Sequence, residues 1–149
     1  MTLDFKVVFD AEDPHRLSAF WADALGYEVE DNSALVQRVL DYGAANDDDV
    51  ITVDGRLAWK TVVAIRHPDD EVDPATGMGQ GRRFLFVAVP EKKSGKNRLH
   101  LDLHVGPDRM HGEAARLGEL GATLVREVRE PGSHHLTLTD PEGNEFDIQ

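Results

Sequence analysis

Cysteine is absent from the 149 residues of this chain. The absence excludes disulfides, thiolate zinc sites and a cysteine nucleophile, and it makes the cytoplasm the expected compartment. Long apolar runs are absent as well. The stretch Phe84 to Val89 stops at Pro90 after six residues, far short of a membrane span. Asp4 and Lys6 interrupt the apolar residues near the N-terminus, so we expect no signal peptide there.

Positive charge is scarce. Lys and Arg number 16 against 28 Asp and Glu, which gives a formal net charge of -12. Nucleic-acid binding needs clustered Lys and Arg, so this balance argues against a nucleic-acid partner. It is compatible with the attraction of a cationic small molecule, although solubility alone also accounts for it. No serine lies in a recognisable nucleophile-elbow motif, which argues against a serine hydrolase.

The segment from Arg98 to Val105 alternates strictly between polar and apolar residues. One face carries leucine and valine, and the other carries Arg98, His100, Asp102 and His104. A period of two predicts a half-buried strand with Leu99 on its apolar face. Two imidazoles and a carboxylate on the polar face make this strand the first candidate for a binding site.

Two segments have the pattern of amphipathic helices. The first, over 13–25, begins at the capping pair Asp13-Pro14 and ends at Gly26. The second, over 108–120, ends at Gly121. A strand is predicted before each helix, and three strands are predicted after each. We expect both helices to lie outside the sheet, and the side chains expected to be buried are Leu17, Phe20, Trp21, Met110 and Leu117.

The strand–helix–three-strand pattern therefore occurs twice within a single 1–149 domain. Module one spans 1–92 and carries an insertion near 32–56, and module two spans 97–149. In module one the predicted first strand runs from Phe5 to Phe9 with Phe5 on the core face. The insertion is expected to hold a short helix capped by Ser33 and a hairpin turning at Asp54-Gly55, followed by a strand from Trp59 to Arg66.

The C-terminal segment has the most specific local motif. Asp140-Pro141-Glu142-Gly143 fits a type I turn, which accepts Asp first, Pro second and Gly fourth. The strand after it alternates, with Phe146 and Ile148 on one face and Asp147 on the other.

These tandem modules, the motif from His100 to Val105 and the ending from Asp140 to Asp147 together resemble the vicinal oxygen chelate superfamily. That superfamily includes glyoxalase I, bleomycin-resistance proteins, fosfomycin-resistance enzymes and extradiol dioxygenases, and the resemblance is closest to its glyoxalase-like branch. It implies an α+β fold in which tandem βαβββ modules form a curved mixed sheet, a cup, with helices outside. It also implies a homodimer.

Metal-dependent members of the superfamily draw ligands from the first and last strands of each module. By this resemblance His100 matches one ligand position and Asp147 another, whereas the positions in module one fall on Lys6 and Val87. A protonated ammonium cannot ligate a metal, so we expect no complete metal site and no cofactor. The alternative is a lyase, isomerase or dioxygenase that holds Zn, Fe, Ni or Mn through His100 and Asp147.

The expected function is therefore small-molecule binding in the cup, and whether a reaction is catalysed stays open. We expect Lys6 to take the place of the metal beside Asp147 or Asp102. The candidate ligand-binding residues are Lys6, His100, Asp102, His104, His135 and Asp147.

Overall fold

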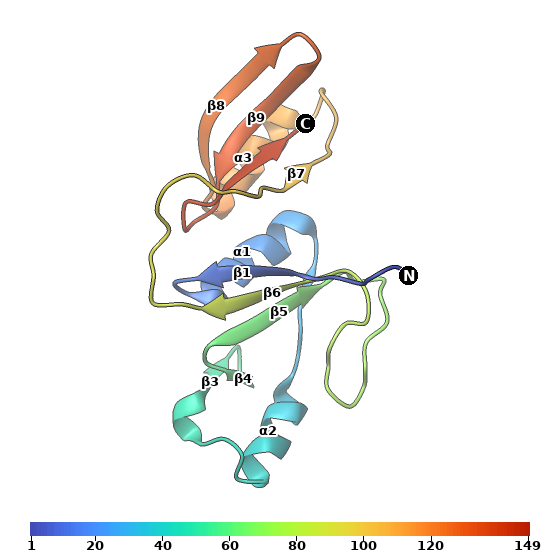
Figure 1. The fold of residues 1–149 in the computed structure, drawn as a ribbon, viewed down its shortest axis with the longest axis vertical. Coiled ribbons are helices and arrows are strands. Elements are labelled where there is room, and N and C mark those ends of the chain that lie inside the picture. Colours follow the sequence, from blue (N-terminus) through green and yellow to red (C-terminus); the bar gives the residue numbers. More distant parts are fainter. The chain divides into compact units, whose positions relative to one another are not determined.

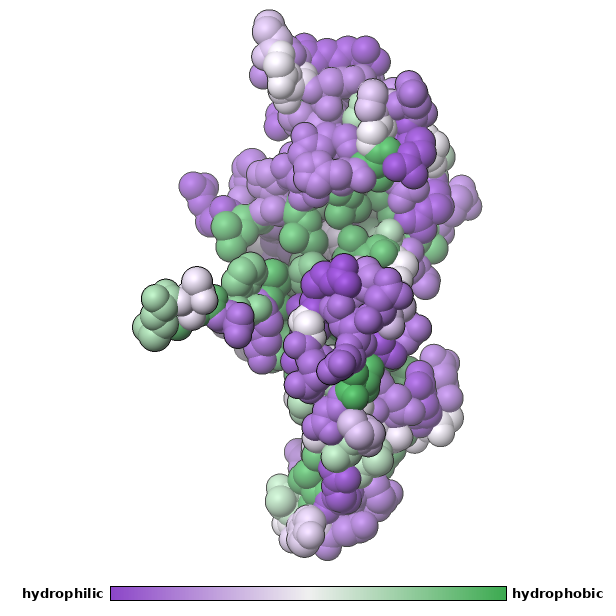
Figure 2. Space-filling view, turned by 90° about the vertical axis from the view of Figure 1, so that its right-hand side faces the viewer, coloured by the Kyte–Doolittle hydropathy of each residue, from purple (hydrophilic) through white to green (hydrophobic).

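The computed structural model describes residues 1–149, which divide into two compact units, Met1–Pro90 and Glu91–Gln149. Each unit combines a four-stranded sheet with a helix packed on one of its faces (Figure 1). Hydrophilic residues cover much of the face drawn in Figure 2, in keeping with the high content of charged residues. None of the helices has both the length and the apolar character needed to cross a membrane.

The first unit is built on a mixed sheet with the strand order β1-β6-β5-β2. Strands β1 and β6 are parallel, and the other pairings are antiparallel. The helix α1 follows β1 and packs on this sheet. The bounds are β1 Val7–Ala11, α1 Pro14–Leu25, β2 Glu28–Val29, β5 Val62–Arg66 and β6 Arg83–Ala88.

Additional elements lie between β2 and β5. They are α2 Ser33–Asp41, a 3₁₀ turn at Asp47–Asp49, β3 Val50–Val53 and β4 Arg56–Trp59. The predicted hairpin is confirmed, because Asp54 and Gly55 adopt φ angles of 48° and 76° between β3 and β4. Two details were wrong. Asn32, not Ser33, occupies the cap position of α2, and the predicted strand after Trp59 is interrupted before Val62.

The second unit has the strand order β7-β10-β9-β8, with β7 parallel to β10 and the remaining pairs antiparallel. Its bounds are β7 Asp102–Leu103, α3 Met110–Leu120, β8 Thr123–Glu130, β9 Ser133–Thr139 and β10 Glu145–Ile148. In both units the first strand lies at an edge of the sheet and pairs in parallel with the last. The two units therefore repeat one βαβββ topology, as the sequence pattern predicted.

The predicted helices are confirmed, and so is the burial of their apolar faces. Leu17, Phe20 and Trp21 are at most 5% exposed, and Met110 and Leu117 are at most 1% exposed. The backbone N–H of Arg16 donates to Asp13 Oδ1 at 3.0 Å, and Gly26 and Gly121 end their helices in the left-handed conformation. The turn at Asp140 is also confirmed, since Gly143 N–H donates to Asp140 O.

Both predicted first strands begin later than expected. In the first unit the strand is shifted by two residues, from Phe5–Phe9 to Val7–Ala11, and in the second it is shortened to Asp102–Leu103. Leu99 is 87% exposed and Phe5 is 91% exposed, so neither lies in a core. The register explains both errors. It pairs Asp147 with Asp102 in parallel, which sets Leu99 opposite a residue of the turn before β10, and it sets Phe5 opposite a residue that precedes β6. Without a partner strand, an alternating sequence has no sheet against which to bury its apolar side chains.

Candidate functional site

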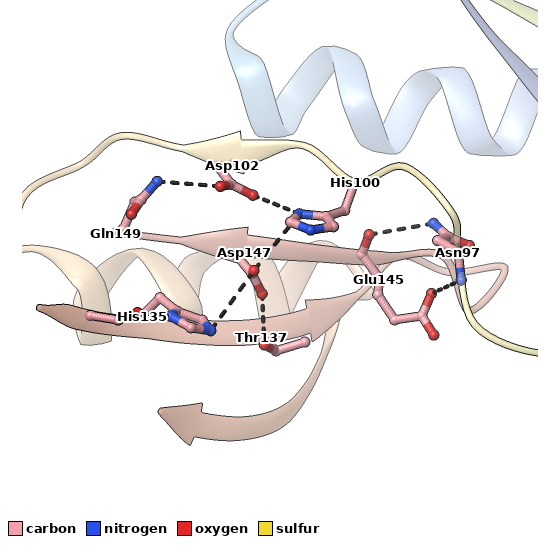
Figure 3. A network of polar contacts seen from close by, with 9 residues as sticks. Asn97, His100, Asp102, His135, Thr137, Glu145, Asp147 and Gln149 are labelled. Carbon is pink, nitrogen blue, oxygen red and sulfur yellow. Dashed lines mark hydrogen bonds and ion pairs between the residues drawn. The ribbon is translucent and has the colours of Figure 1, made fainter. Parts of the chain in front are cut away.

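A polar network lies on the face of the second sheet opposite α3 (Figure 3). We call this side the open face. The alternation of β9 and β10 sends Leu136, Leu138, Phe146 and Ile148 into the core beneath α3, where each is at most 1% exposed. The intervening residues therefore point to the open face. Register then brings them together, because Asp147 pairs with Asp102 on one side and with Thr137 on the other.

The centre of the network is the carboxylate of Asp147. Thr137 Oγ1 donates a hydrogen bond to Asp147 Oδ1 at 2.6 Å. The other oxygen, Oδ2, lies 3.8 Å from His100 Nδ1 and 3.9 Å from His135 Nε2. The Asp147 side chain is 18% exposed, so it is accessible and yet held in a fixed position.

A second carboxylate lies beside the first. Asp102 Oδ1 is 2.7 Å from His100 Nδ1, and Asp102 Oδ2 accepts a long hydrogen bond of 3.4 Å from Gln149 Nε2. The side chains of His100 and Asp102 are 43% and 40% exposed. The two carboxylates therefore lie side by side on a part of the open face that solvent can reach.

Neighbouring contacts hold the segment that carries His100 against β10. The backbone N–H of Asn97 donates to Glu145 Oε2 at 3.0 Å, and Lys93 Nζ lies 3.5 Å from the same oxygen. The hydrogen bond from Asn97, followed by the charge of Lys93, lowers the pKa of Glu145 below its ordinary value. Sequence reasoning missed these supporting residues. The only indication of these residues in the sequence was that Glu145 lies on the same face of the last predicted strand as Asp147.

Four predicted site residues are brought together in this network: His100, Asp102, His135 and Asp147. His104 is exposed directly after β7 and is not part of the network. Thr137 and Gln149 belong to the network and were not among the predicted site residues.

Lys6 belongs to the first unit, where it precedes β1 and is exposed. It lines a cleft of about 660 Å³ together with residues that include Tyr27, Arg82 and Phe84. Lys6 belongs to the first unit and Asp102 and Asp147 belong to the second, so the expected contact of Lys6 with either carboxylate stays a prediction.

Three side chains of the network offer a set of metal ligands. Ligand atoms of His100, Asp102 and Asp147 all lie within 4.8 Å of one another. An imidazole with carboxylates suits divalent transition metals. The parallel strand pair of the first unit offers fewer donors. Val8 pairs with Leu85 there, and the predicted ligand position, the apolar Val87, pairs with Asp10, which is the single carboxylate of these two strands.

The family model described as "Glyoxalase-like domain" matches residues 6–149. The chain belongs to this family. Its membership of the vicinal oxygen chelate superfamily, expected from the sequence motifs, is thereby confirmed. A search of curated protein sequences finds no match.

Solved structures support the fold. The fosfomycin resistance protein FosX from Mesorhizobium loti is 12% identical with a TM-score of 0.61, over 100% of this chain and 91% of that protein. A glyoxalase/bleomycin resistance protein/dioxygenase family enzyme from Burkholderia phytofirmans is 15% identical with a TM-score of 0.58, over 96% and 94% of the two chains. A FosX variant from Listeria monocytogenes, complexed with Mn(II) and a dihydroxypropylphosphonic acid, is 10% identical with a TM-score of 0.58, over 100% and 90%. At these identities the likeness establishes the α+β glyoxalase fold and no particular activity.

Proposed function

We propose that this protein binds a small molecule bearing a cationic or hydrogen-bond-donating group on the open face of the second unit. The observation that carries the proposal is the pair of neighbouring carboxylates, Asp102 and Asp147, in a network that remains partly exposed. Buried charges must be neutralised by partners, whereas partly exposed carboxylates with spare acceptor sites can take a donor from a ligand.

The hydrogen-bond inventory identifies the oxygens that would receive the ligand. Asp147 Oδ1 is engaged by Thr137, but Oδ2 has only imidazole nitrogens at 3.8 and 3.9 Å. Asp102 Oδ2 has only the long contact with Gln149. A carboxylate oxygen can accept more than one hydrogen bond, so both Oδ2 atoms retain capacity for an ammonium, amidinium or guanidinium group.

The test is ligand-induced thermal stabilisation in the presence of a chelator, with matched amines, guanidines and carboxylic acids as probes. Cationic probes should raise the melting temperature, and Asp147→Asn should remove the shift while preserving an acceptor for Thr137. Glu119→Gln removes one charge from an exposed site on α3 and serves as the control. Stabilisation by the carboxylic acids alone, or equal stabilisation of wild type and Asp147→Asn, would show that the proposal is wrong.

Metal-dependent chemistry is the second candidate, because three ligand atoms of His100, Asp102 and Asp147 already lie within 4.8 Å of one another. A divalent ion held there would act as a Lewis acid toward adjacent substrate oxygens in a lyase, isomerase or dioxygenase. The three side chains leave further coordination positions open, as catalytic metal sites do. Elemental analysis after purification without chelator separates the candidates. About one equivalent of Zn, Fe, Ni or Mn per chain, lost in His100→Ala, would favour the metal-dependent function.

A further inference from the structure

Strand β8 forms the outer edge of the second sheet (Figure 1), where β9 is its only neighbouring strand. It is eight residues long, and all of them except Val128 are exposed. Leu124 and Val125 are each 55% exposed. A long edge strand presents unpaired backbone N–H and C=O groups and is a template for pairing with another strand.

The charges along β8 are complementary to those of a second, antiparallel copy. Arg126 and Glu127 precede Val128, and Arg129 and Glu130 follow it. If two copies pair about a two-fold axis at Val128, Glu127 lies opposite Arg129 of the second copy, and Arg126 lies opposite Glu130. The symmetry repeats each pair, so the register creates four oppositely charged pairs and no like-charged pair. Directly opposed charges of opposite sign stabilise antiparallel strands.

The direction of the backbone N–H and C=O groups, which alternates along β8, is consistent with the same register. A two-residue turn, with Gly132 at φ 80°, joins β8 to β9, and Glu130 pairs with Ser133 at its base. The base of such a turn is a hydrogen-bonded pair, and hydrogen-bonded pairs alternate along an antiparallel ladder. Glu127 and Arg129 therefore direct their N–H and C=O groups away from β9. These two residues face each other across the proposed axis.

The side chains needed for two of the pairs are available. Arg126 and Glu130 are exposed and have no ion-pair partner within the chain. Glu127 already contacts Arg129 at 2.6 Å and His134 at 2.8 Å on the strand surface. A second copy would extend that contact into a symmetric cluster of two carboxylates and two guanidinium groups.

We propose that β8 pairs with β8 of a second copy, antiparallel about Val128, so that two four-stranded sheets join into one. The partner is another molecule of this chain, because one alignment of two copies both pairs opposite charges and directs free backbone hydrogen-bonding groups toward each other. A closed two-fold contact of this kind uses the same surface on both molecules and does not propagate into a filament. The proposal is independent of ligand binding at Asp147.

Charge reversal tests the proposal through sedimentation equilibrium across micromolar to high micromolar concentrations. Wild type should show a monomer–dimer equilibrium. Arg126→Glu sets Glu opposite Glu130, and Glu130→Arg sets Arg opposite Arg126. Each reversal should therefore raise the dimer Kd by about tenfold or more. Mixing the two variants should restore dimers, because every pair in the mixed dimer is again of opposite charge.

The mixing experiment also separates a lost interface from a lost fold, since misfolded chains would not recover on mixing. Arg98→Glu and Glu119→Arg make the same charge changes at exposed positions away from β8 and should leave the Kd unchanged. A wild-type chain that stays monomeric throughout, single reversals that leave the Kd unchanged, or mixed variants that remain monomeric would each overturn the proposal.

Discussion

The ion pair between Glu30 and Arg83 allows a sharp test of what stabilises the first unit. The Glu30 side chain is 0% exposed and that of Arg83 is 16% exposed. Arg83 Nε and one terminal nitrogen each donate to Glu30 at 2.8 Å, and the backbone N–H of Gly79 donates to Oε1 at 2.8 Å. The carboxylate thus joins β6 and the loop before it to the chain segment after β2.

Removing one partner should cost far more than removing both. Arg83→Met strands a buried carboxylate whose remaining donor is a single backbone amide, and we expect the free energy of unfolding to fall by about 3–5 kcal/mol. Replacing both residues by methionine leaves no stranded charge, so the double variant should lose less than the sum of the two single losses. Arg56→Met breaks an exposed pair with Asp31, at side-chain exposures of 50% and 47%, and should cost about 0–1 kcal/mol.

The assay is urea unfolding followed by tryptophan fluorescence. Both tryptophans, Trp21 and Trp59, belong to the first unit, so their emission reports on this unit. If Arg83→Met lost no more stability than Arg56→Met, or if the two methionine substitutions were additive, the pair would contribute no more than a surface contact. The reasoning from its burial would then be wrong.

Two further predictions concern the loop between β5 and β6. Hydrogen bonds from Arg82 lower the pKa of Asp70 from 3.8 to about 2, so the stability from this contact is present above pH 3.8 and is lost as the pH falls toward 2. Arg82→Gln should return the pKa of Asp70 toward its ordinary value in an NMR titration, and an unchanged pKa would contradict the assignment. Gly77 has φ 74°, and a Cβ there would lie 1.9 Å from the carbonyl oxygen of Asp31. Gly77→Ala should therefore lower the urea midpoint more than Gly43→Ala, which has a similar φ and no close neighbour.

Local signals predicted the helices and turns well because their causes lie within a few residues. Asp13-Pro14 and Gly26 bound α1 as the capping rules require, and Asp54-Gly55 forms the expected tight turn. Alternation also assigned His100 and Asp102 to one face correctly, since residues two apart on an extended chain share a face.

Features set by register between distant segments were harder to predict. The buried partner of Glu30 lies 53 residues away, and nothing near Glu30 in the sequence distinguishes it from a solvated carboxylate. The length of β7 depends on where β10 begins, which is why Leu99 was wrongly assigned to the core. Asp147 was found only because the resemblance to a known superfamily marked its position.

The two units show why shared topology does not carry shared chemistry. Both contain a parallel pair formed by their first and last strands, but the second unit places Asp102 beside Asp147 there, while the first pairs Val8 with Leu85 and Asp10 with the apolar Val87. Strand order fixes which positions are adjacent, and the residue types at those positions decide whether a ligand meets carboxylates or an apolar surface. The network around Asp147 is therefore a property of a few residues in the second unit. Its function must be tested at those residues, because the fold alone is compatible with binding, lyase and dioxygenase activities.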